Sequence, residues 1–223
     1  MSRSEIFKDI SLQRRSIRAY LPEMVPQEIL DEIFDNSLRA PSNCNVQPWL
    51  VHVVSGELLE DLRKALPQRF MSGEITFDFP YDGKYEGVYR DRQYASAKAV
   101  YDSIGINREE KEKRQKQFMR NFIFFDAPHA AFFFLPEPFG LREAADLGMF
   151  SQTVMLNLTA YGLGSCPQTA LSFHADFIRE RLGIDRSNKL IFGLSFGYPD
   201  LDSPVNDCST GRADLDDIVT FHE

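Results

Sequence analysis

The heptapeptide "RRSIRAY" at residues 14–20 places three arginines within five positions of an otherwise acidic chain. Arg14, Ser16 and Arg18 occupy alternate positions, so their side chains share one face if the segment is extended. Guanidinium groups match phosphate oxygens and polarised carbonyls, and a serine hydroxyl can donate beside them. The segment could therefore bind an anionic ligand, form a solvated helix end or bind nucleic acid.

The net charge of the whole chain bears on these alternatives. Its 223 residues include 25 basic and 33 acidic side chains, which gives a formal net charge of −8. This balance argues against a nucleic-acid partner, because the phosphates would be repelled on average. It is compatible with a local cationic pocket. With 43% hydrophobic residues, the chain can also bury a substantial core.

The number and spacing of the cysteines indicate a reducing cellular compartment. Cys44, Cys166 and Cys208 form no CxxC pair and have no metal-ligand spacing with the histidines, so we expect reduced thiols and no metal site. The N-terminus lacks the apolar core of a signal peptide, and apolar runs such as "AAFFFL" are too short to span a bilayer. We therefore expect a soluble, cytoplasmic protein.

Two further segments combine with the arginine cluster. "APSNCNVQPW" at 40–49 gathers short polar side chains before the only tryptophan, which suits reading the amide-like edge of a heterocycle. "GLGSCPQTAL" at 162–171 places a glycine turn and a proline after a long helix, where backbone can approach a flat ring closely. The chain contains no GxSxG, HExxH or Walker sequence and no GxGxxG after a strand, so hydrolase chemistry is not indicated.

The hydrophobic pattern predicts the elements that position these segments: helices around a small sheet in one α+β domain. Strands are expected at 49–54, 129–135 and 189–198. A first helix is expected after Ser4, which would cap it, and a second between Pro26 and Pro41, which ends it. Further helices are expected at 56–66, 91–103, 107–121, 141–161 and 175–182. Residues 67–90 read as irregular. The helix at 141–161 is apolar around much of its circumference, which predicts burial in a core or at a subunit interface.

Four segments in order resemble the FMN-dependent nitroreductase family, in particular its nitrobenzoate-reductase-like branch. The similarity covers the R-R-S-x-R start, the P-S-x-x-N-x-Q-P-W loop, "FFDAP" at 124–128 and the C-P-Q loop, and it runs from residue 14 to about residue 212. The resemblance implies a nitroreductase-like fold, a domain-swapped homodimer, and FMN with NADH or NADPH as electron donor. It implies a single domain over 1–223 in which residues 67–121 form a substrate-selecting lid.

The resemblance also implies a set of cofactor-binding residues: Arg14, Arg15, Ser16, Arg18, Pro41, Ser42, Asn43, Asn45, Gln47, Asn121, Pro167, Gln168, Thr169 and Arg212. Arg14, Ser16 and Arg212 match residues that hold the FMN phosphate and ribityl oxygens, and Arg18 matches the basic residue near flavin N1 and O2. The 41–45 loop matches one that reaches the flavin of the other subunit, and the 167–169 loop lies over the ring. Arg15 is favoured as a surface or interface residue.

The implied reaction requires no side-chain nucleophile, because the flavin carries the chemistry. NAD(P)H would reduce the flavin and leave, and a nitroaromatic acceptor would then stack on the same face in a ping-pong cycle. One alternative keeps the flavin and changes the acceptor to an enone, a quinone or a halogenated phenol. A flavin-binding protein without turnover is a second alternative.

Overall fold

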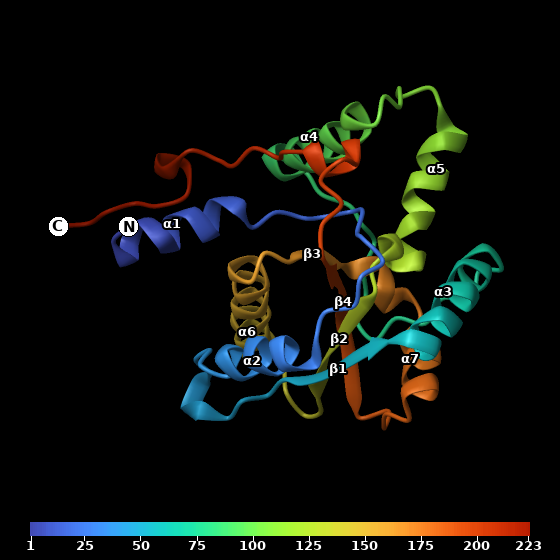
Figure 1. The fold of residues 1–223 in the computed structure, drawn as a ribbon, viewed down its shortest axis with the longest axis horizontal. Helices are drawn as coiled ribbons and strands as arrows, with labels where there is room; N and C mark the ends of the chain where they lie inside the picture. Colours follow the sequence, from blue (N-terminus) through green and yellow to red (C-terminus); the bar gives the residue numbers. More distant parts are fainter.

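Four strands form one antiparallel sheet in the computed structural model, which describes residues 1–223 (Figure 1). The strand order is β1-β2-β4-β3, with β1 and β3 at opposite edges. The strands are β1 (Leu50–Ser55), β2 (His129–Pro136), β3 (Gly164–Gln168) and β4 (Asn188–Gly197). The α+β fold class expected from the sequence is therefore confirmed.

The central strand β2 divides the core into two layers. Successive side chains of a strand point to opposite faces of the sheet. Phe132 and Phe134 accordingly join the apolar cluster on one face, and Ala131 and Phe133 join the cluster on the other. All four are fully buried. An almost continuous apolar run is what a strand covered on both faces requires.

Helices cover each face of the sheet. Figure 1 shows α2 (Gln27–Ser37) and α6 (Leu141–Ala160) on one face, with α3 (Gly56–Met71) and α7 (Ala175–Leu182) on the other. In α6 the positions that recur every three or four residues are buried as expected: Leu147, Phe150, Val154 and Leu158. None of the helices combines the length and apolar character that a membrane crossing requires.

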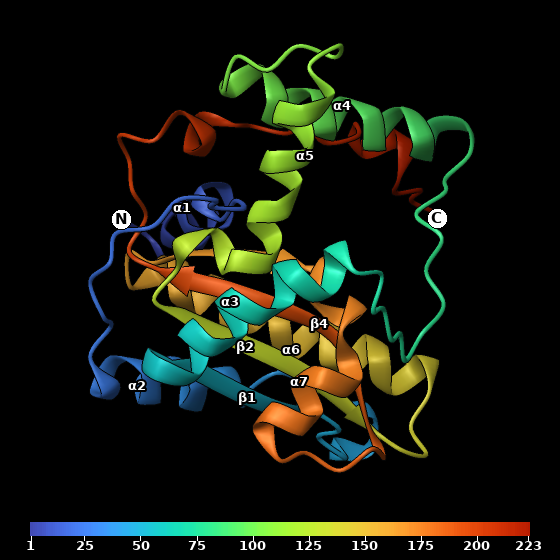
Figure 2. The same cartoon turned by 90° about the vertical axis from the view of Figure 1, so that its right-hand side faces the viewer.

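Three parts of the chain leave this layered body. The helices α4 (Gly87–Ser103) and α5 (Lys111–Met119) bury no side chain of their own and form a hairpin beyond one end of the sheet (Figure 2). The helix α1 (Arg3–Gln13) and the C-terminal tail project from one side of the body (Figure 1). Both carry exposed apolar side chains: Ile6, Phe7, Leu12, Leu215, Ile218, Val219 and Phe221.

The segment between α3 and α4 is irregular but firmly bound where it passes α7. Thr76 exchanges backbone hydrogen bonds with Phe173 over 2.8 Å and with Ala175 over 3.1 Å. The Asp78 carboxylate pairs with the Arg179 guanidinium, and both side chains are almost fully buried. These contacts attach residues 76–78 to the body before the chain enters the α4–α5 hairpin.

Several sequence-based boundaries were wrong. Ser2, rather than Ser4, caps α1 and forms a capping box with Glu5. The helix α3 continues through Pro67 to Met71, so residues 67–71 are helical rather than irregular. The expected helix at 91–103 begins earlier, at Gly87, and α5 ends at Met119 before a 3₁₀ segment, η2 (Arg120–Asp126). Residues 164–168 form the edge strand β3 rather than a loop.

Two histidines are buried within the body. His129 accepts a hydrogen bond at Nε2 from the Val25 N–H over 3.0 Å, and its Nδ1 has no partner. His174 contacts the Glu74 carbonyl through Nδ1, and its Nε2 has no partner. Burial lowers the pKa of both imidazoles, because a charged ring would lose its hydration. Both rings are therefore expected to be neutral in the folded protein at pH 7.

We expect stability to fall as the pH drops below about 6.5, the usual histidine pKa. In that range the unfolded chain binds more protons than the folded chain, so protonation favours unfolding. Urea unfolding at pH 7.5 and 5.5 measures this slope. His129→Gln, which keeps an acceptor for Val25, should reduce it, whereas His222→Gln in the exposed tail should not. Equal slopes for wild type and the His129 variant would contradict this assignment.

Candidate functional site

The Arg14–Arg18 segment runs along the edge strand β3. Ile17 donates its backbone N–H to the Ser165 carbonyl over 2.9 Å, and Ser16 and Ser165 form a parallel bridge. Gly164 permits this close approach, because a Cβ at that position would lie 2.6 Å from Cγ1 of Ile17. A glycine on β3 therefore allows the arginine-bearing segment to lie against the sheet.

The extended backbone sends alternate side chains to different surroundings, as the spacing predicted. Arg14, Ser16 and Arg18 lie close enough to the Cys166 thiol to influence its ionisation. Burial raises the pKa of this thiol, and the neighbouring Arg18, Ser16 and Arg14 oppose that rise. The structure thus gathers the three residues around one point on β3.

Arg15 faces other surroundings. Together with Ile17 it lines a pocket of about 430 Å³, whose walls also include Leu12 and Thr159. This pocket lies where the end of α1 meets the end of α6. The structure therefore separates Arg15 from the three alternate residues.

The C-terminal tail adds a further arginine, Arg212, to the cluster. Burial lowers the pKa of Arg14, and the nearby Arg212 guanidinium lowers it further by repulsion. Arg212 donates only within its own segment, to the Thr210 carbonyl and hydroxyl over 3.0 and 2.9 Å and to the Gly211 carbonyl over 3.0 Å. Residues nearly two hundred positions apart in sequence are thus neighbours.

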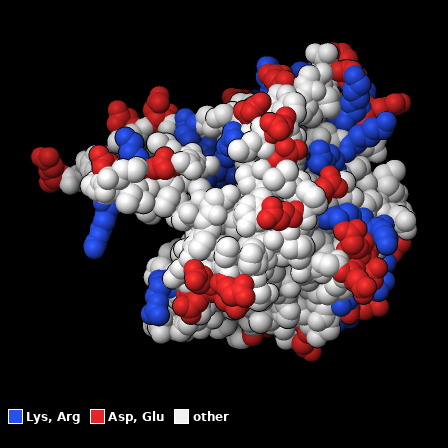
Figure 3. Space-filling view, in the orientation of Figure 1, with Lys and Arg blue, Asp and Glu red and all other residues white.

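This concentration of positive charge is not neutralised by the protein. None of Arg14, Arg18 and Arg212 has a carboxylate within 4 Å, although the chain carries an excess of acidic residues. The space-filling view shows acidic side chains gathered elsewhere, over α2 (Figure 3). Guanidinium groups without counter-ions fit a phosphate dianion, so the residues present suit the FMN phosphate that the resemblance implies.

Asn206 fixes the backbone beside Arg18. Its side-chain Oδ1 accepts from the Arg18 N–H over 2.7 Å, and Nδ2 donates to the carbonyls of Ala19 and Asp200, each over 2.8 Å. This buried amide ties the arginine segment to the start of the tail that carries Arg212. Sequence analysis missed Asn206, and its only local signal was the turn-rich composition of "SPVND".

A second buried amide lies at the end of β3. The Gln168 Nε2 donates to the Asn121 carbonyl over 2.9 Å and to Asn121 Oδ1 over 3.2 Å, while its Oε1 accepts from the Ser195 hydroxyl. These contacts occupy the Gln168 side chain inside the protein. Its neighbours Pro167 and Thr169 are exposed. A ligand at this end of β3 would therefore meet Pro167, Thr169 and backbone groups.

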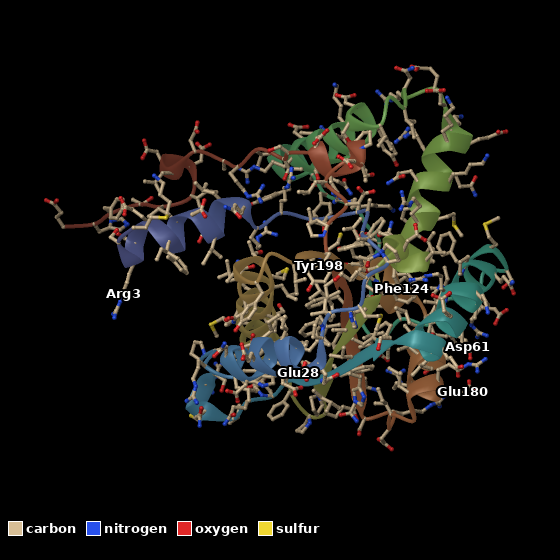
Figure 4. All side chains as sticks on the ribbon, in the orientation of Figure 1. Arg3, Glu28, Asp61, Phe124, Glu180 and Tyr198 are labelled. Atoms are coloured by element: carbon tan, nitrogen blue, oxygen red, sulfur yellow. The ribbon has the colours of Figure 1, made fainter.

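The Asn121 side chain is also held internally, since its Nδ2 donates to the Phe118 carbonyl over 2.8 Å. It begins an unusual turn in which Phe124, Phe125 and Asp126 have φ values of 57°, 53° and 65°. The left-handed region is costly for bulky residues and persists only when surrounding contacts fix it. Figure 4 shows Phe124 between the base of α5 and α3.

Arg63 of α3 supplies those contacts. Its Nε donates to the Ile123 carbonyl over 3.2 Å and its Nη2 to the Ala127 carbonyl over 2.7 Å, so the guanidinium clamps both ends of the left-handed turn. The Glu60 carboxylate pairs with Nη1. No sequence pattern indicated this role, because Arg63 looks like any charged residue on an amphipathic helix.

The Pro41–Gln47 loop is held separately. Its Asn43 N–H donates to the buried Asp146 carboxylate over 3.1 Å, and Ser42 Oγ accepts from the Gln47 N–H over 3.0 Å. The Gln47 side chain donates to the Asn45 carbonyl over 3.2 Å. Behind the loop, Trp49 stacks on Phe150 of α6 with ring centroids 4.7 Å apart, so its ring packs against the core.

Within one protomer, the Pro41–Gln47 loop lies away from the Arg14–Arg18 segment. The loop leads into β1, whereas the cluster lies on β3 at the opposite edge of the sheet. The loop touches α6 at Asp146, and the end of α1 approaches α6 near Thr159. Thirteen helical residues separate these points, or roughly 20 Å at 1.5 Å per residue. The predicted residues thus form two groups within one protomer.

Comparisons with known proteins are consistent across sequence and structure. The sequence model of the nitroreductase family matches residues 12–198. The chain is 40% identical to nitroreductase NfnB of Mycolicibacterium smegmatis, over 93% of this chain and 89% of that protein. It is 32% identical to a 4-nitrobenzoate reductase of Pseudomonas putida, over 90% and 88% of the two chains.

The fold comparison extends over the whole chain. The crystal structure of the FMN-dependent nitroreductase NfnB from Mycobacterium smegmatis, in complex with NADPH, superposes with a TM-score of 0.96 at 37% identity and covers all of both chains. The FMN- and NADPH-dependent nitroreductase NfnB from Sphingopyxis sp. strain HMH gives a TM-score of 0.93 at 32% identity, over 97% of this chain and 99% of that one.

Proposed function

Because this chain belongs to the nitroreductase family, we propose that it binds FMN and uses NAD(P)H to reduce nitroaromatic compounds. The family and the nitroreductase-like fold expected from the sequence motifs are confirmed. Relatives named for nitroaromatic reduction favour this reaction over the alternatives with enones, quinones or halogenated phenols, and over a flavin protein without turnover.

The observation that supports this proposal is the cluster of Arg14, Arg18 and Arg212, which has no carboxylate partner. Arg14 and Arg212 would hold the FMN phosphate, and the Ser16 hydroxyl would donate beside them. Pro167 and Thr169 flank a flat ring site at the exposed end of β3. Bound FMN would accept hydride from NAD(P)H and pass electrons to the nitro group, so no side-chain nucleophile is needed.

Arg18 has a different task. Its backbone is held by Asn206, and its guanidinium has no carboxylate partner. A fixed, unneutralised cation stabilises negative charge that develops nearby during reaction, because it requires no reorganisation at that moment. We assign Arg18 to the N1 and O2 side of the flavin, as the resemblance implies.

We also propose that the active unit is a homodimer. The Pro41–Gln47 loop and the arginine cluster lie in separate parts of one protomer, so a site that uses both draws the loop from a second copy. The exposed apolar side chains of α1 and the tail support this assembly, since contiguous apolar surface favours association.

The acceptor would be chosen by residues 79–89, which lead into α4 and lie within the expected 67–121 lid. The chain leaves the body after Asp78, which the buried Arg179 pair holds in place. Exposed aromatic side chains follow over the next eleven residues: Phe79, Tyr81, Tyr85 and Tyr89. Aromatic rings stack readily on electron-poor rings, which suits a nitroaromatic acceptor.

Dimer formation is tested by light scattering of the FMN-loaded protein at micromolar concentration. We expect twice the mass of one chain, with one FMN per protomer. A double substitution of tail side chains, Ile218→Glu and Phe221→Glu, should weaken association together with FMN retention. A flavin-loaded monomer would contradict the proposal.

Phosphate binding is tested by titrating apoprotein with FMN. Arg14→Ala and Arg212→Ala should each lose roughly 2–4 kcal/mol of FMN binding free energy, because each removes charge-assisted bonds to a dianion. Arg15→Ala is the matched control and should change affinity little. Equal losses at all three positions would show that the inward-facing arginines are misassigned.

The reaction is tested by steady-state and anaerobic kinetics. Nicotinamide and acceptor would use the same ring face, so double-reciprocal plots with a nitrobenzoate should be parallel. Arg18→Ala should slow flavin reduction on the order of 10²-fold while weakening FMN binding less. An enone and a quinone tested in parallel should be poorer acceptors. Intersecting plots, or unchanged reduction in the Arg18 variant, would refute the corresponding part.

A further inference from the structure

A second cavity lies apart from the arginine cluster, inside the α4–α5 hairpin. It has a volume of about 630 Å³ and is enclosed by the second half of α4, the following turn and the start of α5. Its walls combine aromatic and cationic side chains, chiefly Tyr94, Lys98, Tyr101, Arg108 and Arg114. This lining belongs to a hairpin whose two helices have no fully buried side chain.

Arg114 is held in place in this cavity without a counter-ion. Its guanidinium carbon lies 4.7 Å from the centroid of the Tyr101 ring, and Nη1 donates to the Arg108 carbonyl over 3.3 Å. The buried Nε has no acceptor. Arg108 is exposed and forms no ion pair either. Two guanidinium groups therefore remain available to an anion.

The other charged groups in the walls leave this balance positive. Lys98 is already paired with Asp102, so that pair contributes little net charge. Glu109 also lines the cavity, so the three cations Lys98, Arg108 and Arg114 exceed the two carboxylates by one. Figure 3 shows Lys and Arg side chains, interspersed with acidic ones, over the outer end of α5.

Tyr94 adds a flat surface beside these cations. Its ring is largely exposed, whereas Tyr101 lies beneath Arg114. Purine bases stack on aromatic side chains without needing a particular hydrogen-bond pattern. Free guanidinium groups together with an open aromatic ring match a phosphorylated adenosine better than they match an uncharged aromatic acceptor.

The distance between the cavity and the proposed flavin site suits a dinucleotide. Arg114, Phe118 and Asn121 are spaced by four and three residues, so they follow one side of α5 into η2. The seven residues from Arg114 to Asn121 correspond to about 10 Å along a helix. Asn121 contacts Gln168 at the end of β3. An extended dinucleotide can bridge such a separation, with its nicotinamide at β3 and its adenosine in the hairpin.

We infer that the α4–α5 cavity binds the 2′-phosphoadenosine end of NADPH, with Arg108 and Arg114 on the 2′-phosphate and Tyr94 against the adenine. This inference rests on the proposed function, because it assigns the electron donor of that reaction. The 67–121 region then has two functions: residues 79–89 meet the acceptor, and the α4–α5 cavity discriminates NADPH from NADH.

The test measures anaerobic flavin reduction in the FMN-loaded enzyme with NADPH and with NADH. Arg108→Gln and Arg114→Gln should each lower the apparent second-order rate with NADPH about tenfold or more, the usual loss when a charged hydrogen bond is removed. Reduction by NADH should be unchanged, because NADH lacks the 2′-phosphate. Glu109→Gln should improve NADPH use, since it removes a negative charge from the same cavity.

Lys113→Gln is the matched control, because Lys113 is an exposed cation of α5 that pairs with Glu110 and does not line the cavity. It should leave both rates unchanged. Calorimetric titration of the same holoenzyme should show tighter binding of 2′,5′-ADP than of 5′-ADP, and the difference should disappear in Arg108→Gln. This second measurement does not depend on turnover.

Equal losses with NADPH and NADH would overturn the inference, because they would reflect distortion of the hairpin rather than recognition of the phosphate. Equal binding of the two ADP isomers would overturn it as well. If neither NADPH nor NADH reduced the flavin of the wild-type enzyme, the proposed function itself would fail. The two failures are therefore distinguishable.

Discussion

The positive charge shared by Arg14 and Arg212 is the constraint on which the rest of the site depends. The two guanidinium groups repel each other, and burial removes part of the hydration of Arg14. No ion pair relieves this. The hydrogen bond from the Ile17 N–H to the Ser165 carbonyl holds the segment in place instead, together with the hydrogen bonds between Asn206 and the backbone of Arg18 and Ala19. A bound phosphate would therefore find its donors already placed.

The rest of the fold divides into a layered body that fixes backbone positions and an α4–α5 hairpin whose side chains are not buried. The sheet and its covering helices fix backbone positions, as when Arg63 clamps the left-handed turn that leads to Asn121. The buried pair of Asp78 and Arg179 attaches the chain just before it departs into the α4–α5 hairpin. Beyond that point no side chain of α4 or α5 is buried. Residues in the hairpin can therefore serve substrate recognition with little cost to the core.

Much of this organisation could be predicted from the sequence where one physical signal dominates. The apolar run of β2 and the periodicity of α6 identified the core, and the alternation of Arg14, Ser16 and Arg18 predicted their convergence. β3 was missed because Gly164 and Pro167 read as loop residues, although pairing with β4 makes them a strand. Pro67 looked like a helix end, yet α3 packs Leu59, Leu62 and Leu66 and continues. Asn206 and Arg63 act through distant carbonyls, which no local pattern reveals.

The edge position of β3 ties these observations together. An exposed strand edge tends to recruit another strand, and proteins prevent this by covering the edge or by placing proline there. Here the Arg14–Arg18 segment covers the edge at Ser165, and the exposed Pro167 offers no N–H to a further strand. An open strand end beside two arginines without carboxylate partners suits a flat, phosphorylated ligand. The segment that protects the strand edge therefore also forms part of the proposed flavin site.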